Sequence, residues 1–345
     1  MSVLNKKLFF LVVGVSLFFP AYSLETTDRA FEPVMGLKSV TVKESNWYVF
    51  KPFANGYKGF SWETWTSCGI MLQYPDGSEH EFTSDDFETE IVNDFTITDD
   101  SKYLVRAIGR TEMLEALDLV TEESVWGVYF PPPTHIHNVD EADDDYFMVS
   151  DDNLGYVMLV EKNIPHEIFV IYYYDKYCLA AGGFENGFYF SVGAKKWNDP
   201  DSYCITLFDE NFEVTDEVKA NPGGFNMERT IHYLDAENNT VFLYEDQRVS
   251  SVYAYVADDS NWADYAKWHE LVIDGIGYVS GSFKWNGETY YVGVKGDKLY
   301  LLYWDGAEIK RSEEPFAKLG SRYNHCAGVE LVDGNLVIYE CAEPK

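Results

Sequence analysis

Positive charge is scarce in this chain of 345 residues. It carries 26 Lys and Arg residues against 58 Asp and Glu residues, which gives a formal net charge of −32 at pH 7. Such a charge repels the phosphates of nucleic acids and the headgroups of anionic lipids. The composition therefore argues against nucleic-acid binding and describes an acidic protein whose surface favours solubility.

Long apolar runs are almost absent. The longest, Leu8 to Phe19, follows Lys6 and Lys7 and ends at Pro20, and Ala21-Tyr22-Ser23 fits a small-x-small cleavage site. The run is too short to cross a bilayer, which takes about 20 apolar residues. We expect residues 1–23 to be a signal peptide and residues 24–345 to be one exported domain, periplasmic or extracellular, with no transmembrane segment in the mature chain.

Motifs of catalysis are missing as well. The chain has no G-x-S-x-G, no H-E-x-x-H and no P-loop. These absences argue against an enzyme, and no cofactor is expected. No segment has the EF-hand pattern, so calcium binding is not expected. Acidic clusters such as Asp151-Asp152-Asn153 supply oxygen ligands and keep calcium as an alternative. An extracytoplasmic enzyme of the polysaccharide hydrolase or lyase type stays open, because paired carboxylates suffice for that chemistry.

Cysteines are few and odd in number: Cys68, Cys178, Cys204, Cys326 and Cys341. Cys326 and Cys341 lie symmetrically about the Asp333-Gly334 turn, so a two-residue hairpin would place them opposite each other. That separation suits a disulfide, which we predict, with two reduced thiols as the alternative. Cys178 and Cys204 should have a strand between them, and we expect no bond there.

Aromatic residues are abundant, at 17% of the chain, and favour strands. Seven times an extended apolar run breaks at a polar turn and resumes. The turns centre near Asn55, Asp100, Asp152, Asn186, Glu237, Asn286 and Gly334. A repeat of about 46 residues made of strands and turns is typical of the blades of a β-propeller.

The repeat predicts an all-β protein with a single seven-bladed β-propeller. Six or eight blades, or a pair of sandwiches, remain alternatives, because the turns near Asp152 and Asn186 are only 34 residues apart. The expected innermost strands are Trp47–Phe53, Asp94–Thr98, Tyr146–Ser150, Lys176–Ala181, Thr230–Leu234, Ile276–Phe283 and Cys326–Val332. An N-terminal strand, Val40–Lys43, should join the last blade and remove the edges that an open ring would expose.

Two connections between blades, Tyr129–Asp145 and Asp258–Val272, exceed the ordinary length of a loop. The second reads as a short helix capped by Ser260 or Asn261. In the first, His135 and His137 alternate along an extended segment, so both rings could reach one metal ion. Two solvated histidines are the alternative.

Charge and tryptophan suggest a binding face. Loops between second and third strands carry Arg110, Lys162, Lys195, Lys196, Arg248 and Lys295, and the opposite turns carry Asp99, Asp100, Asp151, Asp152, Glu185, Asp235, Glu237 and Asp333. Aromatic rings beside polar groups suit protein or carbohydrate ligands. We therefore expect a binding module that uses Trp197, Trp262, Trp268, Arg110, Lys195 and Arg248, with a structural protein of envelope assembly as a further alternative.

Overall fold

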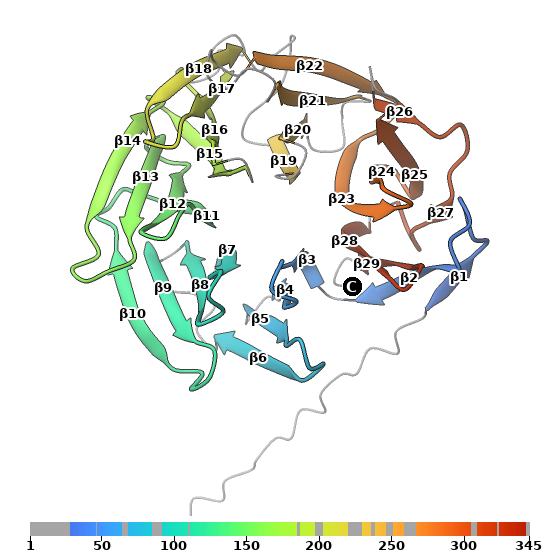
Figure 1. The fold of residues 1–345 in the computed structure, drawn as a ribbon, viewed down its shortest axis with the longest axis horizontal. Coiled ribbons are helices and arrows are strands. Elements are labelled where there is room, and N and C mark those ends of the chain that lie inside the picture. Colours follow the sequence, from blue (N-terminus) through green and yellow to red (C-terminus); the bar gives the residue numbers. More distant parts are fainter. Residues whose placement is uncertain are drawn as a thin grey trace, which may run out of the picture.

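A computed structural model describes residues 28–45, 47–63, 68–84, 92–109, 111–184, 187–196, 203–219, 230–235, 239–245, 251–258, 267–304, 309–322 and 324–342. Within these ranges the chain forms strands and no helix. The strands make seven small sheets arranged in a ring, so the predicted seven-bladed β-propeller is confirmed (Figure 1). No helix of the described residues is long and apolar enough to cross a membrane.

Each blade is an antiparallel sheet that runs outward from the axis, apart from one parallel pair in blade 7. Blade 1 consists of β3 (Trp47–Pro52), β4 (Lys58–Glu63), β5 (Cys68–Gln73) and β6 (Glu79–Ser84), and blade 2 of β7 (Val92–Ile97), β8 (Tyr103–Ile108), β9 (Met113–Asp118) and β10 (Ser124–Tyr129). Blade 3 consists of β11 (Ile136–Glu141), β12 (Tyr146–Asp151), β13 (Tyr156–Glu161) and β14 (Ile168–Tyr173), and blade 4 of β15 (Tyr177–Gly183), β16 (Tyr189–Ala194), β17 (Tyr203–Phe208) and β18 (Val214–Lys219). Blade 5 consists of β19 (Thr230–Asp235), β20 (Thr240–Glu245), β21 (Ser251–Asp258) and β22 (Lys267–Asp274). Blade 6 consists of β23 (Tyr278–Trp285), β24 (Glu288–Lys295), β25 (Lys298–Trp304), β26 (Ile309–Arg311) and β27 (Ala317–Lys318), the last two of which both pair with β25.

Blade 7 closes the ring with both ends of the chain. From the axis outward it contains β28 (His325–Val332), β29 (Asn335–Cys341), β2 (Ser39–Ser45) and β1 (Arg29–Phe31). β2 lies parallel to β29, with Ser39 opposite Asn335 and Ser45 opposite Cys341. The predicted closure by an N-terminal strand is confirmed.

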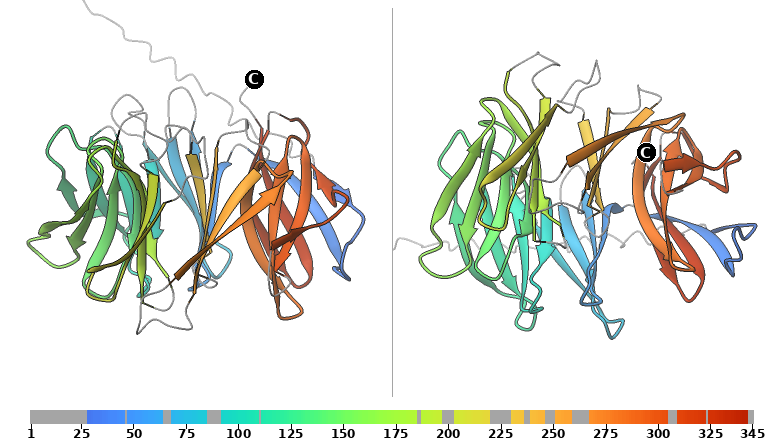
Figure 2. Two further views of the ribbon diagram at one scale, coloured as in Figure 1. Left: turned by 90° about the horizontal axis from the view of Figure 1, so that it is seen from above. Right: turned by 45° about the horizontal axis from the view of Figure 1, so that its top comes forward.

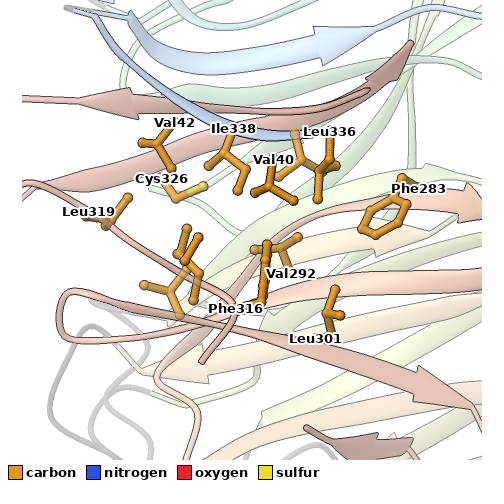
Figure 3. Close-up of a cluster of buried hydrophobic side chains, with 14 of the residues drawn as sticks. Val40, Val42, Phe283, Val292, Leu301, Phe316, Leu319, Cys326, Leu336 and Ile338 are labelled. Atoms are coloured by element: carbon orange, nitrogen blue, oxygen red, sulfur yellow. The ribbon is translucent and has the colours of Figure 1, made fainter. Parts of the chain in front are cut away.

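The hydrophobic core is divided among the interfaces between blades. The described residues form seven buried clusters, one between each pair of neighbouring blades. Middle strands therefore bury both faces, as in β16, where all six residues are buried, whereas the outer strand β10 alternates between exposed and half-buried residues. Figure 3 shows the cluster between blades 6 and 7, where Val40 of β2 lies near Leu336 and Val292, and Val42 lies near Cys326 and Ile338.

One innermost strand was predicted incorrectly. Tyr146–Ser150 belongs to β12, the second strand of blade 3, and the innermost strand is β11, which lies inside the supposed long loop Tyr129–Asp145. The turn near Asp152 therefore joins second and third strands, which explains its short distance from Asn186. The other six expected innermost strands coincide with β3, β7, β15, β19, β23 and β28.

The strand directions give the ring two faces, seen edge-on in Figure 2. We call the turn face the one that carries the turns from first to second and from third to fourth strands, such as residues 98–102 and 162–167. We call the link face the one that carries the turns from second to third strands and the connections between blades, such as residues 151–155 and 130–135. Antiparallel neighbours place these two sets of loops at opposite ends of the strands.

Candidate functional site

The expected binding residues are only partly covered by the structure. Arg110, Trp197, Arg248 and Trp262 lie outside the described residues. Trp268 belongs to β22, and the structure does not describe its side chain. The predicted helix is wrong where it can be compared, since Asp258 ends β21 and residues 267–272 are part of β22; Ser260 and Asn261 lie outside the described residues. Asp258–Val272 is also not a connection between blades, because β21 and β22 are the third and fourth strands of blade 5.

Lys195 is already engaged by neighbouring side chains. Its Nζ lies 2.6 Å from Oε2 of Glu217 on β18, and the same carboxylate accepts a hydrogen bond from the Tyr172 hydroxyl of β14. The ammonium also lies 6.0 Å from the centre of the Tyr172 ring. The hydrogen bond to Glu217 raises the pKa of Lys195 above its ordinary value. This cluster joins blades 3 and 4 at the outer rim, and a ligand of Lys195 would have to share Glu217.

The expected division of charge between the faces needs two corrections. Because β11 is the innermost strand of blade 3, Asp151 and Asp152 lie on the link face and Lys162 lies on the turn face. There Lys162 is paired with Glu141 and donates to the carbonyl of Asp143. The turn of residues 142–145 adds three aspartates to the turn face, which is therefore strongly acidic around blade 3.

The two histidines do not share a partner. Nδ1 of His135 lies 2.6 Å from Oδ1 of Asp152, and Nδ1 of His137 lies 3.0 Å from the carbonyl oxygen of Leu179 in blade 4. The side-chain hydrogen bond to Asp152 raises the pKa of His135. Among the described residues, no group of three or more His, Cys, Asp or Glu side chains is placed to hold a metal ion. A zinc site at this pair remains a prediction without a third ligand.

The hairpin of the predicted disulfide has a different register. From Val332–Asn335 to Gly328–Tyr339 the pairs are those expected, but a bulge at Ala327 then shifts the strands. Cys326 consequently pairs with Glu340 and His325 with Cys341, so the two cysteines are not opposite each other. All five cysteines are buried free thiols. Cys178 and Cys204 flank Gly193 of β16, as the expectation of an intervening strand required.

A groove at the outer rim between blades 3 and 4 was not foreseen. It encloses a cavity of about 470 Å³ lined by Tyr146, Leu159, Phe169, Ile171, Asn211, Phe212, Glu213 and Val214, and we call it the blade 3–4 groove. The lining comes from β12, β13 and β14 on one side and from the turn between β17 and β18 and the first residue of β18 on the other. Its size falls within the usual range for ligand pockets, about 300–1,000 Å³.

Aromatic rings build the wall of the groove. Tyr146 meets Phe169 edge-on at 6.1 Å and Phe212 edge-on at 6.0 Å. Phe212 has a positive φ of 61° and stacks at 4.6 Å on Tyr189 of β16, whose hydroxyl donates to the carbonyl of Ala142. These contacts fix the wall before any ligand arrives, which lowers the ordering cost of binding.

Apolar side chains remain exposed along the same rim. Phe169 is 41% exposed and Val214 is 44% exposed, so the groove is open to solvent. Val170 and Tyr173 of β14 are also more than half exposed, on the strand that ends the sheet of blade 3. Exposed apolar groups gathered on one strand mark interaction sites more often than isolated ones do.

Carboxylates surround this apolar surface. Glu213 is the one charged residue in the lining. Burial raises the pKa of Tyr189 to about 12, and the nearby charges of Asp143, Asp140 and Glu210 add to that shift. The groove is therefore lined mainly by apolar residues, with polar groups also reaching its surface, and carboxylates lie at its rim.

The sequence contains a signal for this groove that strand patterns alone do not reveal. Residues 168–173 read IFVIYY, a continuous apolar run that is typical of a strand buried on both faces. Placed at the outside of a blade, the same run must expose part of its apolar surface. The groove could have been found only by combining the run with the correct strand position in blade 3.

The comparisons with known proteins concern the fold. No protein-family model matches the chain, and no curated protein matches it by sequence. A chain from the structure of a mitotic checkpoint complex is similar with a TM-score of 0.59 at 8% identity, with 83% of each chain covered. The β-propeller domain of Cps50 (Swd1) from Myceliophteria thermophila gives a TM-score of 0.55 at 10% identity, with 84% of this chain and 90% of that chain covered. A putative 6-phosphogluconolactonase from Bacteroides fragilis gives 0.58 at 11% identity, with 86% of this chain and 88% of that one covered. At these identities the likeness establishes the β-propeller fold, which commonly serves as a module for interactions, and specifies no activity.

Proposed function

We propose that this protein is an exported β-propeller that binds another protein, and that the blade 3–4 groove is the site of contact. The observation that carries the proposal is the open cavity, lined mainly by apolar residues, beside the outer strand β14, whose exposed side chains have no covering element among the described residues. Export is supported by the apolar segment Leu8 to Phe19, which follows two lysines.

A protein ligand fits this surface better than a carbohydrate. The cavity is lined by Phe169, Phe212 and aliphatic side chains, and Tyr146, Asn211 and Glu213 supply polar side-chain groups. Carbohydrate sites need several hydrogen-bonding groups directed at hydroxyls, whereas protein interfaces are centred on buried aromatic and aliphatic side chains surrounded by polar groups. The groove has the second composition.

Site-specific photocrosslinking in the native cell tests the proposal. A benzophenone amino acid replaces Phe169 in the full chain, and a second version carries it at Val125, which is 51% exposed on β10 of blade 2. We expect a discrete protein adduct from position 169 and not from position 125. The absence of an adduct at 169, or the same adducts at both positions, would contradict binding at this groove. Cell fractionation of the same strain tests export independently.

A further inference from the structure

From the shape and charge of the groove, we infer the chemistry of its ligand: an extended, cationic segment with at least one large aliphatic or aromatic side chain that enters the cavity. The inference rests on the proposed function, because it describes the partner of the same site. It is carried by three independent features, which are the cavity, the acidic rim and the open edge of β14.

The cavity selects the apolar side chain. Phe169, Tyr146 and Phe212 present rings at edge-on angles, which leaves faces and edges available to an aliphatic or aromatic group. Leu159 and Ile171 complete the apolar lining. Moving one such side chain from water into the cavity removes apolar surface from solvent and can anchor a short segment.

The rim selects positive charge. Glu213 lines the cavity, Glu210 lies in the same turn, and Asp143 is close enough to affect the pKa of Tyr189. The nearby cation Lys162 is already paired with Glu141, and Lys195 is paired with Glu217. The ion pairs of the described ranges thus engage these lysines and leave Glu210 and Glu213 to a ligand, while Asp143, whose Oδ1 accepts hydrogen bonds from the N–H groups of Asp145 and Tyr146, adds negative charge. Lysine or arginine beside the anchor would meet these carboxylates.

The open edge of β14 favours a ligand whose backbone is extended. β14 is hydrogen-bonded to β13 on one side and is the last strand of its sheet. An outer strand presents alternate N–H and C=O groups that can pair with an added strand, and pockets for alternate side chains then give specificity. Phe169 and Ile171, two residues apart on β14, both line the cavity. Every second side chain of a strand faces the same side, so a ligand strand that pairs with β14 can place one of its side chains in the cavity.

A second copy of this chain is disfavoured as the occupant. Each copy carries a formal charge of −32, and each groove is bordered by carboxylates. Two such surfaces repel one another, whereas a cationic segment is attracted, with an association that weakens as salt rises. The charge of the molecule therefore favours a partner of opposite sign.

The experiment measures the affinity of the mature protein for fluorescent heptapeptides. The probe alternates lysine with isoleucine; one control peptide replaces isoleucine with serine, and another replaces lysine with glutamate. We expect fluorescence anisotropy to detect the probe, with both controls weakened about tenfold or more. Equal binding of the lysine–serine peptide would overturn the inference, because it would show attraction to charge alone.

Variants of the protein place the binding site. Phe169→Asp should weaken the probe about tenfold or more, and Val214→Asp provides a second disruption if the first variant fails to fold. Val125→Asp, on blade 2 with similar exposure, should leave binding unchanged. Glu213→Gln should weaken binding about threefold at low salt, whereas Glu123→Gln, at the matching position of blade 2, should not. The site would be refuted if the blade 2 variants lost binding as well, or if no variant lost binding.

Two N-methylated probes test the extended backbone. One carries methyl groups on alternate amides and the other on the remaining amides, and only the peptide whose unmodified amides face β14 should bind. Equal binding of both would refute strand pairing.

Sedimentation that showed dimers of the wild type, converted to monomers by Phe169→Asp, would assign the groove to a second copy instead. A cellular adduct at position 169 together with failure of every peptide would leave the proposed function intact and overturn the ligand chemistry.

Discussion

At the scale of the residue, Asp140 is an acid whose ionised form is destabilised by burial. It lies on the innermost strand β11, where Oδ2 accepts a hydrogen bond of 2.9 Å from the backbone N–H of Gly183 in blade 4. Burial raises its pKa from the ordinary 3.8 to about 6, while the hydrogen bond from Gly183 and the charge of Lys51 oppose that rise and the charge of Asp94 adds to it. The hydrogen bond that joins the two blades favours the charged carboxylate, but the cost of burial outweighs it, so the folded protein favours the protonated acid.

The sign of the pH dependence follows from this shift. Between pH 4 and pH 6 the folded protein keeps a proton on Asp140 that the unfolded chain has lost, so the free energy of unfolding falls as the pH rises. Asp140→Asn keeps an oxygen for Gly183 and removes the titration. We expect the variant to gain up to about 1 kcal/mol per pH unit relative to the wild type across this window. Urea unfolding of both proteins from pH 4 to 7 measures it, and parallel curves would disprove the assignment.

Single residues were the hardest features to predict from the sequence. The basic loop predicts Lys195 as a binding residue, yet its partners Glu217 and Tyr172 lie on the outer strands of neighbouring blades. These two partners are 45 residues apart, about one repeat, so their meeting follows only from the register of the blades. Charge patterns along the chain contain no information about such pairs until the fold is known.

At the scale of the element, β11 shows why strand prediction failed in blade 3. Its sequence IHNVDE has few apolar residues, because three of its polar side chains bond to the neighbouring blades. His137 reaches Leu179, Asn138 reaches Asp94, and Asp140 reaches Gly183. An innermost strand can therefore be stabilised by hydrogen bonds between blades. A search for alternating apolar residues misses such a strand, whereas the other six innermost strands have enough apolar residues to be recognised.

The bulge in the terminal hairpin gives a prediction about cysteine chemistry. Because Ala327 shifts the register, Cys326 and Cys341 no longer form an opposed pair. We expect the purified mature protein to contain five free thiols. Denaturation without reductant, alkylation and mass measurement should therefore add five labels. Three labels, with Cys326 and Cys341 recovered in one linked peptide, would restore the disulfide predicted from the turn.

At the scale of the whole molecule, the ring and its blade number were predictable because the turns are chemically distinct. Gly56, Gly187, Gly287 and Gly334 all have positive φ in turns from first to second strands, where glycine is favoured. Repeated turns of this kind identified blades 1, 4, 6 and 7 directly. The groove between blades 3 and 4 was not predictable in the same way, because it depends on how two outer rims meet.

Closure of the ring depends on the N-terminal strands. Val40 and Val42 of β2 are fully buried, and burial of each contributes about 1.5–3 kcal/mol. Arg29 of β1 pairs with Glu340, whose side chain is fully buried and also accepts a hydrogen bond of 2.6 Å from the backbone N–H of Gly320. A chain without β1 leaves this carboxylate without its cation, and a chain without β2 also exposes the edge of β29.

Stepwise truncation should separate these contributions. Compared with residues 24–345, a chain of residues 36–345 lacks β1 and should melt a few degrees lower, by about 1.5 °C for each kcal/mol lost in a chain of this size. A chain of residues 46–345 also lacks β2 and should melt at least about 10 °C lower, with a broadened transition, because the last blade is left with two strands. Thermal unfolding followed by circular dichroism gives all three values. Equal stability of the shortest and longest chains would mean that the ring holds without its N-terminal closure, and that the contacts between blades alone suffice.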